Sequence, residues 1–182
     1  MVIFLHSVSK KEDYILRLID HHSILTTFSL PYLFKHKPNR YLYMKKLCEK
    51  GLVEFKKYPR YKVWYLTQTG KKYVTKKRGR YIDAIRTDKI TKNHLAHIVA
   101  ATNLEIKLDK KYKNTQDISK YSPNRYIKNE QKTLNVVPDC EFTYLGKYNV
   151  AFEISVIKKS EKQYYNNFQK YLENEKYHRV YW

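Results

Sequence analysis

The feature that most constrains the fold is residues 37–69, where a helical pattern stops sharply and strand patterns follow. Pro38 lies near the first helical turn, where a missing N–H is tolerated. Gly51 supplies the left-handed residue that commonly ends a helix. One apolar face, at helical spacing, is formed by Met44, Leu47 and Cys48. The sequence therefore predicts a helix that ends at a defined residue, directly before an extended segment.

Two short strands are predicted after this helix. Val53 and Phe55 alternate with charged residues, which is the period of a strand. Pro59 lies in the turn, and the return strand carries Val63, Tyr65 and Leu66. A helix that fits the major groove, followed by a hairpin, is the arrangement of a winged helix-turn-helix. We expect residues 1–77 to form such a DNA-binding domain, with the hairpin as its wing.

The predicted DNA contacts are cationic and polar side chains of the helix and the wing. On the helix face opposite Met44 and Leu47 we expect Asn39, Tyr43 and Lys46, flanked by Arg40 and Lys45. The wing carries Lys56, Lys57, Arg60 and Lys62. A basic run behind it adds Lys76, Lys77, Arg78 and Arg80, as a phosphate-binding arm or part of a linker over residues 78–91.

The charge balance supports a polyanionic partner. The chain has 182 residues, with 37 Lys and Arg against 17 Asp and Glu, a net charge of +20 spread along its length. Such an excess favours DNA, because each neutralised phosphate releases counterions. An anionic membrane would also attract it, but no long amphipathic basic helix is evident, and no apolar run approaches the roughly 20 residues of a membrane span. The two cysteines are too few for a disulfide framework. We expect a cytoplasmic protein.

Two helices are predicted before residue 37. Ser9 and Glu12 form a capping box for a helix over residues 11–22, and a short helix follows within residues 28–34. His21, His22 and His36 have no cysteine pair at ligand spacing, so we interpret them as surface residues and not as a metal site.

The second half predicts a separate domain over residues 92–182. A helix over residues 92–108, capped by Thr91, precedes a strand near residues 124–127 and then two strands joined at Gly146. A helix over residues 160–174 and a terminal strand complete the order helix, three strands, helix, strand. This order resembles the core of restriction-endonuclease-like domains. The fold class is thus α+β: a winged helix-turn-helix domain followed by a small restriction-endonuclease-like α/β domain.

One pair of carboxylates in this half suggests chemistry. A turn at Gly146 would place Asp139 and Glu153 opposite each other across two antiparallel strands. Such a pair suits Mg²⁺ or Mn²⁺, which can activate water against a phosphodiester. The segment around them resembles the PD-D/E-x-K nuclease motif, but Ser155 stands in place of its lysine. Lys158 is the nearest candidate substitute. This departure argues against full nuclease activity, and in the alternative Asp139 caps a turn while Glu153 pairs with a lysine.

The pattern over residues 11–175 is similar to the plasmid replication-relaxation proteins. His97 on the helix after the wing, Pro138, Asp139 and Glu153 match that family, whereas Cys140 replaces a glycine and Ser155 a second acid. The resemblance implies DNA binding in plasmid or mobile-element replication or mobilisation, beside replication or relaxase proteins of the same element.

Three functions remain open from the sequence. The first is a sequence-preferring duplex-binding protein, acting as a dimer at repeated sites and needing no cofactor. The second is a metal-dependent nuclease or nickase that uses Asp139 and Glu153. A relaxase with a tyrosine nucleophile ranks last, because no histidine triad accompanies it. The 19 tyrosines and seven phenylalanines are either core and surface residues or a platform for unpaired bases.

Overall fold

A computed structural model describes residues 7–78, 91–112, 118–123, 137–155, 160–173 and 176–181. The chain divides into two compact units, Met1–Lys89 and Ile90–Trp182. Within the described residues it is a mixed α+β protein with six helices and two small sheets, in agreement with the expected class. Arg80 and Lys158, both named as site candidates from the sequence, lie outside the described residues.

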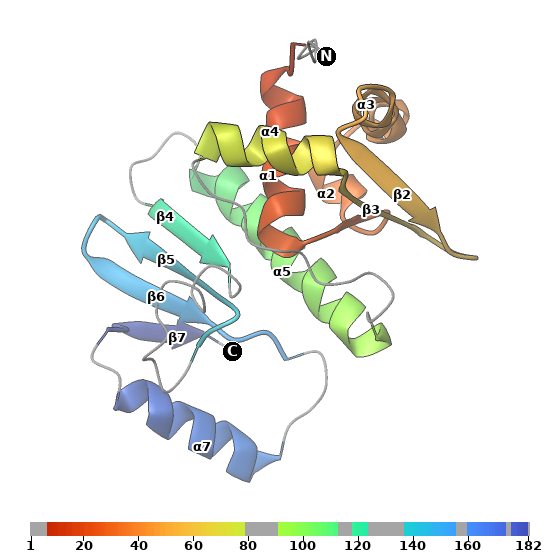
Figure 1. The fold of residues 1–182 in the computed structure, drawn as a ribbon. Helices are drawn as coiled ribbons and strands as arrows, with labels where there is room; N and C mark the ends of the chain where they lie inside the picture. Colours follow the sequence, from red (N-terminus) through yellow and green to blue (C-terminus); the bar gives the residue numbers. More distant parts are fainter. Residues whose placement is uncertain are drawn as a thin grey trace. The chain divides into compact units, whose positions relative to one another are not determined.

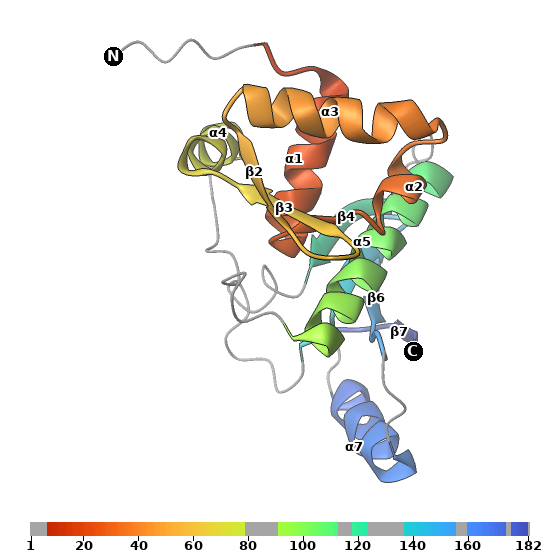
Figure 2. The ribbon, with the colours of Figure 1, turned by 90° about the vertical axis from the view of Figure 1, so that its right-hand side faces the viewer.

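Over residues 7–78, the first unit contains four helices and one antiparallel sheet. Its elements are α1 (Lys10–His22), β1 (Leu25–Thr26), α2 (Leu30–Leu33), α3 (Lys37–Glu49), β2 (Val53–Lys57), β3 (Lys62–Leu66) and α4 (Gln68–Arg78). The strands lie in the order β1-β3-β2. The β2–β3 hairpin projects away from the helices of this unit (Figure 1), and α3 runs across the direction of α1 (Figure 2).

The start of α1 forms as the sequence predicts. Ser9 accepts from the Glu12 N–H, and the Glu12 carboxylate accepts from the Ser9 N–H at 2.7 Å, which completes the capping box. Ile15, Leu18 and Ile19 are fully buried. Glu12 also forms an ion pair with Lys50, whose Nζ lies 2.8 Å from Oε1. This pair ties the start of α1 to the C-cap of α3.

The prediction for α3 is confirmed at both ends. Pro38 occupies its first turn, Met44 and Leu47 are buried, and Gly51 has a φ of +65° just past the C-cap. The short helix before it differs from the prediction, because Leu25 and Thr26 form a strand and α2 is only one turn long. Paired with β3, this segment satisfies its backbone polar groups in the sheet.

Burial along the hairpin does not follow the simple alternation of buried and exposed residues that a period of two suggests. Phe55 is 46% exposed, whereas Trp64 is buried. Strand β3 is central, paired with β1 on one side and β2 on the other, so Val63 and Trp64 are both covered. Phe55 lies on a strand at the sheet edge, where the Lys62 ammonium covers its ring at 4.7 Å from the centroid.

The segment after the wing forms a helix. Thr67 caps α4, since its hydroxyl accepts from the Gly70 N–H at 3.0 Å, and the helix continues to Arg78. The predicted boundary at residue 77 therefore falls within the last turn of α4. Gly70 is required by close packing: a Cβ placed there would lie 2.0 Å from the Leu52 carbonyl oxygen.

Substituting Gly70 tests this packing. In Gly70→Ala the new methyl group would collide with the backbone of Leu52 and force the two segments apart, costing about 1–3 kcal/mol of unfolding free energy. Urea denaturation of the whole chain measures this. Thr75→Ala, at an exposed position of the same helix, is the control and should change stability by less than about 0.5 kcal/mol. Equal stability of the two variants would contradict the close approach.

The contacts of Glu12 make the free energy of unfolding depend on pH. Burial acts to raise the pKa of Glu12, but the hydrogen bonds from Lys50 and Ser9 outweigh it and leave that pKa below its usual 4.5. The stabilisation is therefore present above about pH 4.5 and lost as the pH falls through the lowered pKa.

Glu12→Gln should lower the free energy of unfolding at pH 7 by about 1–3 kcal/mol and flatten its dependence on acid. Urea denaturation between about pH 2 and 7 measures both effects, because the pKa of Glu12 lies below the usual glutamate value of about 4.3–4.5. Glu49→Gln removes an exposed pair with Lys45 instead and should cost no more than about 0.5 kcal/mol.

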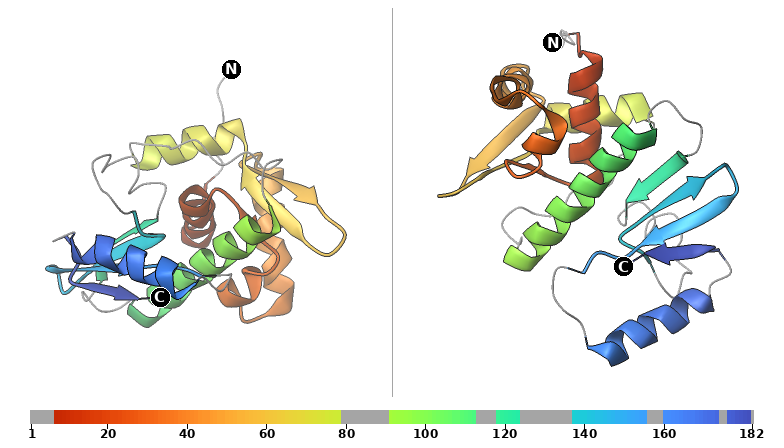
Figure 3. Two further views of the ribbon diagram at one scale, coloured as in Figure 1. Left: turned by 90° about the horizontal axis from the view of Figure 1, so that it is seen from below. Right: turned by 180° about the vertical axis from the view of Figure 1, so that it is seen from behind.

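The second unit contains one mixed sheet and two helices within the described residues. Its elements are α5 (Lys92–Tyr112), β4 (Ile118–Pro123), β5 (Cys140–Tyr144), β6 (Tyr148–Phe152), α7 (Glu161–Leu172) and β7 (Arg179–Tyr181). The strand order is β4-β5-β6-β7, with β7 parallel to β6 and the other pairs antiparallel. The α7 helix lies on the β7 side of this sheet (Figure 3).

The predicted element order is found here, with local differences. Thr91 caps α5 as expected, accepting from the His94 N–H at 3.2 Å. The first strand comes earlier than predicted, at Ile118–Pro123, and residues 124–127 lie outside the described residues. The apolar side chains of α7 are only partly covered, because Tyr171 is buried while Phe168 and Leu172 are 44% and 61% exposed.

Candidate functional site

The outward face of α3 is largely available to solvent. Asn39, Lys45 and Lys46 are exposed and Arg40 is half-buried. Tyr43 differs from its predicted place on this face, because its ring stacks on the buried Phe34 at 5.3 Å and is itself half-buried. The Lys46 ammonium lies 5.8 Å from the centroid of the Tyr43 ring, so Tyr43 contacts a cation and does not point freely into solvent.

Two exposed residues on α3 were missed by the sequence reasoning. Tyr41 and Leu42 are 46% and 45% exposed. The sequence did indicate that Leu42 is exposed. Leu42 lies two residues before the buried Met44, and two residues along a helix turn a side chain by about 200°, to the opposite face. A short apolar surface thus accompanies the cations of α3. Among those cations, Lys45 is partly neutralised by Glu49, 3.6 Å away on the next turn.

The hairpin tip combines aromatic rings with cations. The Tyr58 N–H donates to the Tyr61 carbonyl at 2.8 Å, and the two rings stack at 4.8 Å. Phe28 lies 5.5 Å from Tyr61 and extends the group of rings. The predicted wing cations Lys56, Lys57 and Arg60 are exposed, and Lys62 is half-buried beside Phe55. The tip is therefore a cationic projection whose turn is held by aromatic stacking.

The basic run behind the hairpin is only partly available. Lys76 is exposed, whereas the Lys77 Nζ lies 2.9 Å from Asp13 Oδ2, and this hydrogen bond raises the pKa of Lys77. The Tyr73 hydroxyl also donates to Asp13, at 3.2 Å. Lys77 therefore joins α4 to α1, which weakens its case as a DNA contact. Arg78 is the last residue of α4.

The two carboxylates of the second unit are brought together as the sequence predicts. Cys140 pairs with Phe152, and Gly146 lies in the turn with a φ of +70°, so the expected register is correct. The Asp139 N–H donates to the Phe152 carbonyl at 3.0 Å, just before β5. Asp139 and Glu153 therefore stand at the same end of neighbouring strands.

Both carboxylates have close partners within the unit. Asp139 Oδ1 lies 2.9 Å from His97 Nε2, and Asp139 Oδ2 accepts from the Ile154 N–H at 2.7 Å. Glu153 accepts from the hydroxyl of the buried Tyr171 on α7. The Asp139 carboxylate thus bonds across the strands to Ile154 and to His97 on α5, and not within a local turn as the alternative expected, and the partner found for Glu153 is a tyrosine instead of the expected lysine.

These contacts do not favour a metal between Asp139 and Glu153. Each Asp139 oxygen already has a donor, and Glu153 has a hydroxyl donor. No group of three metal-ligating side chains is found within the portion of the chain that the structure describes. The contacts of Asp139 and Glu153 form a hydrogen-bonded joint between α5, the sheet and α7.

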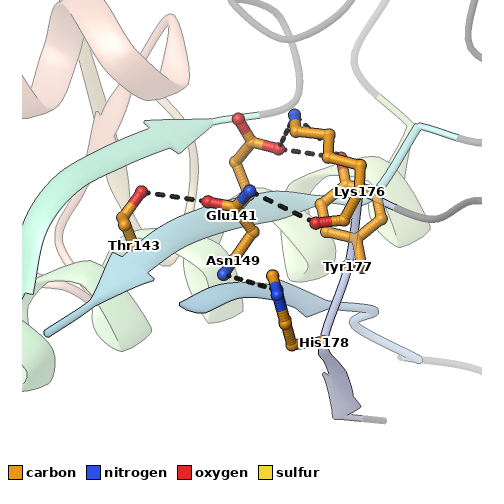
Figure 4. A network of polar contacts seen from close by, with 6 residues as sticks. All are labelled: Glu141, Thr143, Asn149, Lys176, Tyr177 and His178. Atoms are coloured by element: carbon orange, nitrogen blue, oxygen red, sulfur yellow. Dashed lines mark hydrogen bonds and ion pairs between the residues drawn. The ribbon is translucent and has the colours of Figure 1, made fainter. Parts of the chain in front are cut away.

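A second network, on the same sheet face, was not found from the sequence (Figure 4). Glu141 is buried and accepts from Lys176 and, at 2.7 Å, from the Tyr177 hydroxyl. The Asn149 side chain donates to the Lys176 carbonyl at 3.2 Å. These bonds fasten the segment before β7 to β5 and β6. They join residues 35 and 27 positions apart, which no local pattern reveals.

The two tyrosines of these networks, the buried Tyr171 and the half-buried Tyr177, have raised pKa values. Burial, and then the hydrogen bond to Glu153, strongly raise the pKa of Tyr171. Burial and the bond to Glu141 do the same to the pKa of Tyr177. A nucleophilic phenol needs the opposite shift, because its ionised form attacks. Tyr171 and Tyr177 therefore serve as hydrogen-bond donors.

Removing one hydroxyl tests the joint at Glu153. Tyr171→Phe should lower the free energy of unfolding by about 1–3 kcal/mol, because a half-buried carboxylate loses its donor. Tyr165→Phe on the same helix, at a ring 62% exposed, should change stability by less than about 0.5 kcal/mol. Urea denaturation compares the two, and equal effects would contradict a structural role for this bond.

A protein-family model described as "Replication-relaxation" matches residues 16–180. The chain therefore belongs to the replication-relaxation family, as the motif resemblance indicated, and this membership supports a role in plasmid or mobile-element replication or relaxation. Searches among curated proteins and among solved structures found no significant match. Among the described helices, none combines the length and apolar character that crossing a bilayer requires.

Proposed function

We propose that the first unit is a winged helix-turn-helix module that binds duplex DNA during replication or relaxation of a plasmid or mobile element. The order α1-β1-α2-α3-β2-β3 and the antiparallel sheet β1-β3-β2 support this assignment. In such modules the helix before the hairpin enters the major groove, and α3 occupies that place. The family membership supports DNA as the partner.

The observation that carries the proposal is the set of exposed cations on α3 and the projecting hairpin. Lys45, Lys46, Lys56, Lys57 and Arg60 are exposed on two adjacent elements of one unit. The buried residues of α3 are the apolar Met44 and Leu47, so the helix keeps its charged side chains in solvent. A chain with a net charge of +20 gains affinity for phosphates through counterion release.

The second unit is, in this proposal, a restriction-endonuclease-like scaffold without nuclease activity. The order α5-β4-β5-β6-α7-β7 and the mixed sheet support that scaffold. The donors already bound to Asp139 and Glu153, and Ser155 in place of the motif lysine, support a structural role for the acids. Binding would then need no metal, and dimerisation at repeated sites or association with the element's replication proteins would supply further function.

Fluorescence anisotropy with a labelled duplex from the element's own origin tests the DNA-binding proposal. Arg60→Ala should weaken binding on all sequences and lower the slope of log affinity against log salt by about one, because a phosphate contact is lost. Lys46→Ala should cost about 1–3 kcal/mol on the preferred sequence if Lys46 contacts a base. Lys170→Ala, an exposed lysine of α7, is the matched control and should leave the salt slope unchanged.

The same preparation separates binding from cleavage. Supercoiled plasmid carrying the origin, incubated with Mn²⁺ or with a chelator, should be shifted in both cases and nicked in neither. Nicking that needs Mn²⁺ and disappears in Asp139→Asn and Glu153→Gln would establish the nuclease alternative instead. Absence of any duplex binding at low salt would refute the winged-helix proposal.

A further inference from the structure

A cavity of about 680 Å³ lies within the second unit, and the carboxylate joint does not use it. Its volume falls in the range of about 300–1,000 Å³ typical of small-ligand sites. Phe142 and Val150 line it and are 8% and 4% exposed. The other lining residues are Tyr112, Tyr144, Tyr148, His178, Arg179 and Tyr181. Rings therefore dominate the cavity, and none of the lining residues that the structure describes is acidic.

The strand registers explain why the rings gather on one face. Tyr144 pairs with Tyr148 across β5 and β6, and Phe152 pairs with Tyr181 across β6 and β7. Directly paired residues share a face, so these side chains stand on the side opposite Glu141. The Phe152 ring stacks on Phe142 at 5.4 Å and on Tyr181 at 5.2 Å. A continuous band of stacked rings crosses three strands.

Part of this aromatic band is open to solvent, and its rim is cationic. Tyr148 and Tyr181 are 38% and 46% exposed. The Lys147 ammonium lies 4.8 Å from the Tyr148 ring centroid, and Arg179 is exposed. His178 packs edge-on against Tyr148 at 5.5 Å. Exposed rings beside cations offer stacking faces and phosphate partners at the same place.

The rim is held in position by the network on the other side of the sheet. His178 Nδ1 accepts from the Asn149 N–H at 3.1 Å, and the Asn149 carbonyl accepts from the His178 N–H at 2.9 Å. The bonds of Asn149 and Glu141 to Lys176 fix the preceding residues (Figure 4). The His178 ring and the backbone that leads into Arg179 are therefore held in place before a ligand arrives, which favours binding.

We propose that this cavity binds unpaired bases of single-stranded DNA, with the exposed tyrosines stacking on the bases and Arg179 and Lys147 meeting the phosphates. A paired base hides its faces within the helical stack, so a ring-lined cavity with a basic rim favours a single strand. The inference deepens the proposed function, because replication and relaxation both expose single strands, but it concerns a different unit from the duplex-binding surface.

Anisotropy with a labelled oligothymidylate of about 12 nucleotides tests it, a length within the site sizes of single-strand-binding modules. An abasic oligonucleotide of equal length carries the same phosphates without bases. We expect the abasic strand to bind about tenfold more weakly to the full chain, since stacking on bases is lost. Equal affinity for the two strands would overturn the proposal.

Variants locate the binding at the cavity. Tyr148→Ala should weaken oligothymidylate binding about tenfold and reduce the difference between the two strands, whereas Tyr148→Phe should keep both within about twofold, because the ring is retained. Tyr181→Ala, at the second exposed ring, repeats the test if Tyr148→Ala misfolds by circular dichroism. Tyr165→Ala, on α7 and outside the cavity, is the control. Unchanged affinity in both cavity variants would refute the site.

The duplex assay keeps this inference separate from the proposed function. Tyr148→Ala should bind duplex as the parent chain does, and Lys46→Ala should retain the preference for oligothymidylate over the abasic strand. Loss of duplex binding alone would count against the winged helix only. A fall in oligomer mass by light scattering in Tyr148→Ala, with DNA affinity unchanged, would assign the cavity to a second copy of the chain and overturn the proposal.

Discussion

The pairing of β5 with β6 is the constraint on which the second unit depends. Gly146 takes the left-handed conformation in the turn, and the register that follows pairs Cys140 with Phe152. A slip of one residue would exchange the two faces of each strand. With the observed register, Asp139 and Glu141 share one face, while Phe142 and Tyr144 share the other. One tight turn thus separates a hydrogen-bonded polar face from a ring-lined one.

Three of the few acids lie in ion pairs within the units, where they offset part of the positive charge of this basic chain. Glu12 pairs with Lys50, Asp13 with Lys77 and Glu141 with Lys176. Each pair joins segments far apart in the sequence and neutralises a cation where repulsion would otherwise oppose packing. Cations of α3 and the hairpin remain largely in solvent. This distribution of charge therefore stabilises the packed units and leaves an exposed cationic surface that suits phosphates.

Much of the local structure was predictable, because it follows from short-range rules. The capping box at Ser9, the helix stop at Gly51 and the turn at Gly146 each involve residues within a few positions of one another. The candidate site was less predictable. Asp139 and Glu153 were placed correctly, but their partners His97 and Tyr171 come from helices on either side in the sequence. The alternation of Val53 and Phe55 predicted the strand but not the exposure of Phe55, which depends on which strand is central in the sheet.

The sequence by itself determined the element order, the turn residues and the excess of positive charge, since these depend on local conformational preference and on counting. Tertiary structure alone decided what each side chain meets. It gave Asp139 two donors, buried Tyr171 against Glu153 and turned Tyr43 onto Phe34. It also assembled the ring-lined cavity from α5 and three strands. The physical reason is that burial and hydrogen bonding depend on distances in space, and those are set only when distant segments pack.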